Sequence, residues 1–135
     1  MKKLFSSKYS DNLISFALLL LRLGMGGLMI PHGFQKLTNF AAKSSSFADP
    51  FHIGPTLSMA LVIFAEFFCA VFIVVGLMTR LASIPLILVM SVALFHVHQG
   101  KVFSEGETAT LFLSGFLALL IAGPGKFSMD RLIGK

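Results

Sequence analysis

Charged residues are scarce in this 135-residue chain, cysteine occurs once, and tryptophan is absent. Asp, Glu, Lys and Arg make up 13% of the residues, whereas ordinary soluble domains carry about 25%. A single thiol, Cys69, excludes an internal disulfide and a Cys-x-x-Cys redox pair. Hydrophobic residues reach 56% and the mean hydropathy is +0.86. This composition argues against a soluble domain, because so small an interior cannot bury that much apolar surface.

Apolar segments of membrane-spanning length recur along the chain. The hydrocarbon core of a bilayer is about 30 Å thick, so a spanning helix needs about 20 mostly apolar residues. Four helices are predicted, at about 13–36, 56–78, 81–98 and 107–122. With short connections between them, they predict one all-α transmembrane domain over residues 1–135, an antiparallel up-down-up-down four-helix bundle.

Turn and capping residues mark the predicted helix ends. In Gly54-Pro55 the proline stands at a first helical position, where its missing N–H is harmless. Ser104 and Glu107 have the spacing of a capping box that would open the fourth helix. Gly123-Pro124-Gly125 ends that helix, and Ser128-Met129-Asp130 is expected to open a short interfacial turn.

Lysine and arginine positions predict the orientation. Bases accumulate on the cytoplasmic side of membrane proteins. With four spans, the side of both termini would carry Lys2, Lys3, Lys8, Arg80, Lys126, Arg131 and Lys135, against Lys36, Lys43 and Lys101 on the other. Both termini are therefore predicted in the cytoplasm. The net charge of +5 is interpreted as this topology signal and not as nucleic-acid binding, because the bases are not clustered.

Two ionisable residues fall inside predicted spans. Such residues are costly in a membrane and by default mark a functional site. Arg22 lies about ten residues inward from the outer end of the first helix, taken near His32, and Glu66 lies about ten inward from Thr56. The helices are antiparallel, so an Arg22–Glu66 pair is expected near mid-membrane. It is either a structural link between two helices or part of a ligand or proton site.

More polar residues gather at the predicted outer helix ends. His32 and Lys36 are one helical turn apart, and Arg22 and Met29 share that inward face. His96 and His98 close the third helix and cannot both face inward; His96 is favoured. Glu107 opens the fourth helix. An outer mouth is therefore expected that joins His32, Lys36, His96 and Glu107 above Arg22 and Glu66.

Small residues and the lone thiol suggest how the helices pack. Gly24, Gly26 and Gly27 would let another helix approach the first one closely. Cys69 follows Glu66 by about one turn and is expected to be an inert buried thiol.

Three motifs together resemble those of the DoxX family of small bacterial membrane proteins. They are the runs Arg22-Leu23-Gly24 to His32-Gly33-Phe34-Gln35-Lys36-Leu37, Glu66 with Gly76-Leu77-Met78-Thr79-Arg80-Leu81-Ala82, and Gly123-Pro124-Gly125 to Asp130. The resemblance implies a four-helix protein of the bacterial cytoplasmic (inner) membrane, with relatives in redox complexes. By position it implies interest in Arg22, His32, Lys36, Glu66, Arg80 and Glu107, with His96 added.

A redox-associated subunit that binds a quinone or similar amphiphile at the outer mouth is the first functional hypothesis. Glu66, His32, Lys36 and Glu107 would be the catalytic groups, and Arg22, His32, His96 and Lys36 would bind the ligand. The chain has no flavin motif and no iron–sulfur cysteines, so a protein partner would supply electrons. Whether it forms a homo-oligomer stays open.

Two alternatives are kept. One is a non-catalytic membrane anchor or assembly subunit whose Arg22–Glu66 pair is structural. The other, a minor one, is a haem held by two of His32, His96 and His98, or a metal held by His32, His96 and Glu107. No metal site is otherwise expected.

Overall fold

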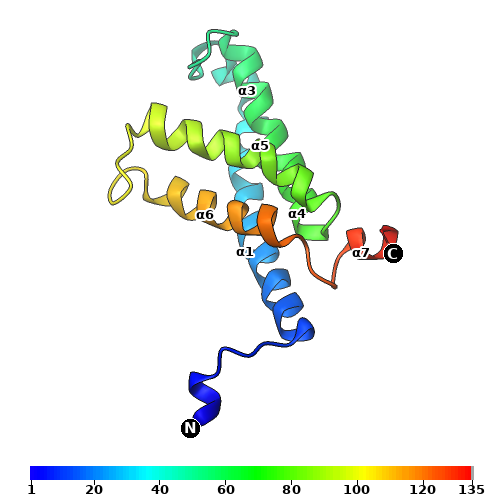
Figure 1. The fold of residues 1–135 in the computed structure, drawn as a ribbon. Coiled ribbons are helices and arrows are strands. Elements are labelled where there is room, and N and C mark those ends of the chain that lie inside the picture. The colour runs from blue at the N-terminus through cyan, green and yellow to red at the C-terminus, as the bar shows by residue number, and fades with distance from the viewer. Residues whose placement is uncertain (135) are drawn as a thin grey trace.

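The computed structural model describes residues 1–134, which form helices, turns and loops without a strand (Figure 1). Lys135, counted above among the inner bases, lies outside the described residues. The prediction of an all-α protein is confirmed over the part of the chain that is described. Short helices flank the long ones: η1 (Lys2–Phe5), α2 (Phe40–Lys43), η2 (Ser44–Ser46) and α7 (Met129–Ile133).

The first long helix, α1, runs over Asp11–Thr38. Ser10 caps it, since its hydroxyl accepts a hydrogen bond from the Leu13 N–H at 3.2 Å. The buried face of α1 carries Arg22, Gly26, Met29 and Gly33, spaced three or four residues apart as one side of a helix requires. The predicted inward direction of Arg22 and Met29 is confirmed.

The second long helix contains a wide turn. It begins as α3 (Pro55–Ile63), passes through the π-helical turn η3 (Phe64–Cys69) and ends as α4 (Ala70–Val75). Pro55 stands at a first helical position as predicted. The helix stops at Gly76, whose φ of 75° is left-handed, a conformation that glycine adopts without a Cβ penalty.

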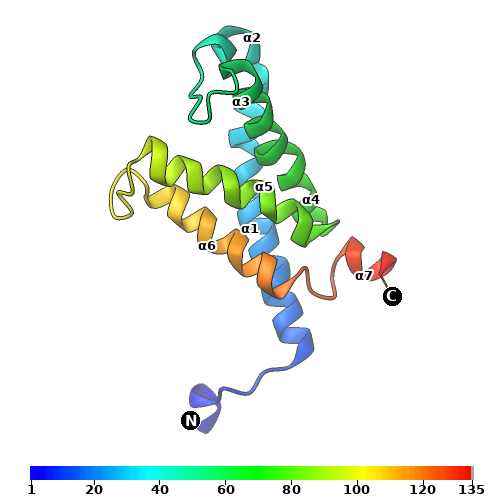
Figure 2. The ribbon, with the colours of Figure 1, turned by 45° about the horizontal axis from the view of Figure 1, so that its top comes forward.

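The third and fourth helices lie side by side and antiparallel in both views (Figures 1 and 2). Helix α5 (Thr79–Val92) continues into a second π-helical turn, η4 (Ala93–Val97), and a loop leads to α6 (Glu107–Ala122). Residue Gly106 stands at the N-cap of α6 and no side chain caps this end. The predicted Ser104–Glu107 capping box is therefore wrong, because Gly106 and not Ser104 is the last residue before the helix.

Three of these helices are long and apolar enough to cross a bilayer, over Asp11–Thr38, Pro55–Val75 and Thr79–Val97. Helix α6 is apolar but shorter, with 16 residues. Large apolar side chains on all four helices point outward, for example Leu20, Leu61, Leu88 and Leu111. An apolar exterior of this kind is stable in lipid and unstable in water.

Two glycines set how closely α1 approaches the second helix. A Cβ placed on Gly33 would lie 2.5 Å from the Phe67 nitrogen, and one on Gly26 would lie 2.8 Å from the Ala70 oxygen. Cβ positions on Gly24 and Gly27 would meet nothing within 4 Å. Of the three glycines named from the sequence, only Gly26 therefore makes the predicted close contact, and Gly33 makes one that was not predicted.

This contrast gives a matched test of helix packing. We expect Gly33→Ala and Gly26→Ala to lower the free energy of unfolding in detergent by about 1–3 kcal/mol, because backbone must move aside. Gly24→Ala and Gly27→Ala should leave it unchanged or raise it by up to about 1 kcal/mol, since alanine favours helix. Equal effects of all four substitutions would contradict this packing.

Candidate functional site

An ion pair joins the first two long helices. The Lys36 Nζ donates to Glu66 Oε2 at 2.5 Å. The Glu66 side chain is 6% exposed and that of Lys36 is 30% exposed. In the part of the chain that the structure describes, this is the only side-chain hydrogen bond that either group makes, so donors of Lys36 and the second carboxylate oxygen of Glu66 are free to bind a ligand.

The π-helical turn η3 presents Glu66. Its wider turn fits an extra residue, and such turns occur frequently at functional sites. Within η3, Ala65 and Cys69 are buried, and Gly33 of α1 lies directly against the Glu66 backbone. The absence of a side chain at Gly33 lets the two helices come close enough for Lys36 to reach the carboxylate. Cys69 is 2% exposed, as the sequence led us to expect.

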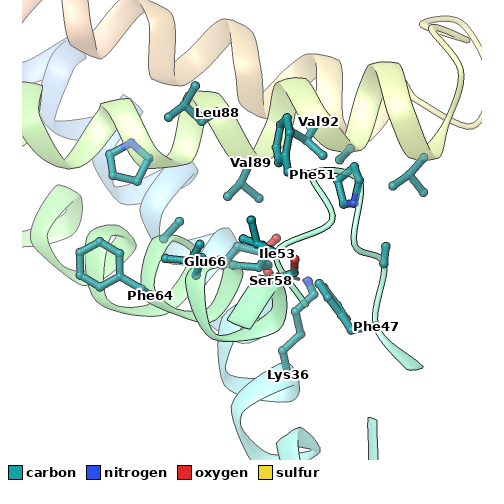
Figure 3. A pocket seen from close by; sticks show the side chains of 18 residues that line it. Lys36, Phe47, Phe51, Ile53, Ser58, Phe64, Glu66, Leu88, Val89 and Val92 are labelled. Atoms are coloured by element: carbon teal, nitrogen blue, oxygen red, sulfur yellow. Dashed lines mark hydrogen bonds and ion pairs between the residues drawn. The ribbon is translucent and has the colours of Figure 1, made fainter. Parts of the chain in front are cut away.

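A cavity of about 570 Å³ lies beside this pair (Figure 3). Residues of α3 and η3 line one side of it and residues of α5 and η4 the other, and the loop that follows η2 covers one end. Lys36, Ser58 and Glu66 are its polar lining residues. The apolar ones are Phe47, Ala48, Pro50, Phe51, Ile53, Leu61, Val62, Phe64, Ala65, Pro85, Leu88, Val89, Val92, Ala93 and Val97. A large apolar space with few polar groups at one place is typical of a small-molecule site.

Asp49 holds the covering loop to α3. Its carboxylate accepts hydrogen bonds from the N–H groups of Ile53 at 3.0 Å and Gly54 at 2.8 Å, and from the Ser58 hydroxyl at 2.9 Å. Burial raises the pKa of the Asp49 carboxyl, but these bonds, with the His52 charge, lower it below its usual value. Asp49 was missed in the sequence. Its position a few residues before the helix start at Gly54-Pro55 could have indicated that it binds the N–H groups there.

The residues of the predicted outer mouth lie in separate places in the structure. His96 is exposed and its ring lies 6.0 Å from that of Phe51, a cavity residue, whereas His98 is half-buried, so the preference for an inward His96 is not supported. His32 packs edge-on against Phe112, at 6.0 Å between ring centroids, and lines a separate hollow with Gln35. Glu107 is exposed at the start of α6. Of the six predicted site residues, only Lys36 and Glu66 come together.

Arg22 lies far from Glu66, so the predicted pair is wrong. Gly33 lies against Glu66, while Arg22 lies against Gly76, near the other end of the second helix. Arg22 and Gly33 are about 16 Å apart along α1 at about 1.5 Å per residue. The estimate of equal depth failed because helical structure continues past His32 through α2 to Lys43.

The partners of Arg22 come from the C-terminal segment. Its Nη2 donates to the Phe127 carbonyl, and its side chain is 1% exposed. Asp130 accepts hydrogen bonds from the N–H groups of Met78 at 2.6 Å and Thr79 at 2.9 Å, and so caps α5. These contacts tie the chain after α6 to α1 and to the α4–α5 turn. As predicted, Ser128 opens α7, where its hydroxyl accepts from the Arg131 N–H.

Within residues 1–134 no group of three or more His, Cys, Asp or Glu side chains is placed to hold a metal ion. Arg80, highlighted by the family resemblance, is exposed, and its Nη2 donates to the Ile121 carbonyl at 3.4 Å. It lies next to the α4–α5 turn, the end of the second helix that Arg22 contacts, and does not line the cavity.

The long apolar helices and their apolar exterior define a multi-pass helical membrane protein. The profile of the DoxX family matches residues 17–99, and the chain belongs to that family. It is 31% identical over 125 residues to the inner membrane protein YqjF of Escherichia coli (strain K12), an alignment that covers 87% of this chain and 92% of that one. The chain is accordingly a multi-pass protein of the bacterial inner membrane.

A second relative is an uncharacterised protein of Haemophilus influenzae, 24% identical over 127 residues, covering 88% of this chain and 84% of that one. No solved structure matches the chain.

Paired substitutions test the ion pair. Lys36→Met and Glu66→Gln should each lower the free energy of unfolding, because each leaves a polar or charged group without its partner. The double variant should lose less than the sum, with a coupling energy of about 1–3 kcal/mol. As the matched control, a cycle between Arg22→Met and Glu66→Gln should be additive within about 0.5 kcal/mol. A coupling energy in the Arg22–Glu66 cycle but none in the Lys36–Glu66 cycle would contradict this ion pair and favour the pair predicted from the sequence.

The Asp49 contacts predict a pH dependence of the covering loop. Because the pKa of Asp49 is lower in the folded state than in the unfolded one, its stabilising contribution is complete above about pH 4 and is lost as the pH falls through the folded pKa. The protection factors of the amides of residues 47–54, which compare measured with intrinsic hydrogen-exchange rates, should then fall below about pH 4. Asp49→Asn should have low protection factors already at pH 7, and they should vary little with pH; high protection in that variant would contradict this role.

Proposed function

We propose that this chain is a redox-associated membrane subunit that binds a quinone or similar small amphiphile in the cavity beside Lys36 and Glu66. The observation that carries the proposal is the position of a lone ion pair on the wall of an apolar cavity of about 570 Å³. A quinone requires apolar surroundings for its ring and tail, and polar partners for its carbonyl oxygens. The cavity offers both.

The ion pair has the chemistry to receive a quinone or quinol head. Lys36 uses one hydrogen bond on Glu66, so its remaining N–H donors are free to bind a carbonyl oxygen. The second oxygen of the Glu66 carboxylate can accept a hydrogen bond from a quinol hydroxyl and can take up the proton of that hydroxyl. His96, beside Phe51 at the covering loop, is a further donor in this proposal, whereas His32, Glu107 and Arg22 take no part.

The electrons come from a partner protein in this proposal. Reduction of a quinone to a quinol consumes two electrons and two protons. Glu66 serves the proton exchange, and the sequence offers no flavin motif or iron–sulfur cysteines of its own. In the proposed orientation both termini face the cytoplasm and the covering loop faces the opposite side. The basic residues on the inner loops support this orientation, which requires α6 as the fourth span of the proposed four-helix bundle.

A second candidate function is a membrane anchor or assembly subunit without chemistry. The Arg22 contacts favour it: this buried cation does not line the cavity beside Glu66, and with Asp130 it binds three chain segments together. In that case the Lys36–Glu66 pair would likewise serve only to join helices. The two functions differ in whether the cavity binds a ligand.

Binding in lipid nanodiscs distinguishes them. We expect decylubiquinone or a menaquinone analogue to raise the melting temperature of the wild-type protein, because a ligand of the folded state stabilises it. Lys36→Met and Glu66→Gln should weaken binding about tenfold or more, as loss of a charged hydrogen bond does. Val89→Trp should also block binding by filling the cavity, whereas Leu81→Trp, on an exposed residue of α5 outside it, should not.

Each outcome decides between the candidates. If no quinone binds the wild-type protein in nanodiscs, and lipid extracts of the purified protein contain none, the quinone proposal fails and the anchor function stands. If quinone binds and the Lys36 and Glu66 variants bind equally well, the ion pair is not the site.

A further inference from the structure

We infer that the cavity takes its ligand sideways from the lipid, and that the ligand is a single-headed lipophile whose tail stays between α3–η3 and α5. This inference rests on the proposed function for the existence of a ligand. It adds the route of entry, the direction of the bound molecule and the class of molecule admitted.

The cavity has a rim at the depth of the hydrocarbon core. Leu61, Phe64 and Leu88 line the cavity and are 50%, 48% and 61% exposed. Phe64 lies nine residues after Pro55 and Leu88 nine after Thr79, which places each about 14 Å along its helix at about 1.5 Å per residue. Both positions are near the middle of helices of spanning length. In a membrane, exposed apolar side chains at that depth face lipid tails.

The other end of the cavity is covered. Phe47, Pro50 and Phe51 of the loop lie over it, and Figure 3 shows Phe47 and Phe51 at the end opposite Phe64. Three hydrogen bonds from Ile53, Gly54 and Ser58 to Asp49 hold this loop. A ligand arriving from water would have to break them. A ligand arriving from lipid meets only apolar side chains.

The cavity lining limits the ligand to one polar end. Of the polar residues that line it, Ser58 already donates to Asp49, which leaves Lys36 and Glu66. A sugar or nucleotide would leave several polar groups buried without partners, at about 1–3 kcal/mol or more for each. A compact head on a long apolar tail has fewer polar atoms, and it gathers them at one end beside the ion pair. The head therefore lies at the ion pair, and the tail leaves past Phe64 and Leu88.

Two quinones with one head group test the need for a tail. In nanodiscs of defined lipid, decylubiquinone is compared with the tailless 2,3-dimethoxy-5-methylbenzoquinone. The dissociation constants refer to the quinone concentration within the bilayer, so that different partitioning into lipid does not affect the comparison. We expect the tailed quinone to bind at least tenfold more tightly. A decyl tail carrying a terminal diazirine should label residues 61–64 and 85–88, as located by mass spectrometry of digested protein. Labelling within 47–53 instead would reverse the direction of the ligand.

Matched variants test the route. Leu88→Trp at the rim should slow association of the tailed quinone at least fivefold, whereas Leu81→Trp, on a residue of α5 that is 62% exposed and lies outside the cavity, should not. Asp49→Asn, which loosens the covering loop, should leave the association rate unchanged. Faster association in Asp49→Asn with normal association in Leu88→Trp would show entry from the aqueous side and overturn lateral entry. Quinone binding itself would survive that result, while its absence from wild type would refute the proposed function.

Discussion

The close contact between α1 and the second long helix is the constraint on which the other features of this protein depend. At Gly33 the backbone of α1 lies against Glu66 and Phe67, closer than any side chain would allow. This contact fixes the register of the two helices. It sets Lys36 against Glu66 at one end of the interface and Arg22 against Gly76 at the other. The positions of both cations thus follow from one contact between backbones.

The two cations are compensated in different ways. Lys36 binds a carboxylate beside a cavity, and its long side chain can adjust its position. Arg22 donates to a backbone carbonyl from the C-terminal segment, with the Asp130 charge nearby, and it does not line the cavity beside Glu66. Its Nε and Nη1 have no hydrogen-bond partner within residues 1–134. One end of the interface is therefore suited to bind a ligand, and the other holds the segment that follows α6.

The sequence predicted what depends on periodicity and on local turns. Hydropathy located the long helices, Gly54-Pro55 located the start of α3, and the spacing of Arg22 and Met29 identified the buried face of α1. The partner of Glu66 was not predictable by counting residues, because the length of helical structure beyond His32 decides the register. The π-helical turns have no sequence signature. The contacts of Asp130 were not predictable because the fold brings the distant Met78 and Thr79 N–H groups to it, whereas Asp49 was missed although its partners are local.

The π-helical turn also affects how the second helix tolerates changes of length. An α-helix advances about 100° per residue, and a π-helical turn fits one more residue than a regular turn would. Deleting one residue within Phe64–Cys69 would therefore leave a regular helix only about 1.5 Å shorter, still able to cross the bilayer. The faces before and after the turn would keep their relative direction, because the wide turn alone takes up the extra residue, whereas the side chains inside the turn, Glu66 among them, would point elsewhere. Membrane insertion and the geometry at Glu66 are thus separable properties of one helix, so related chains that differ by one residue at this turn would share the fold without sharing the pocket.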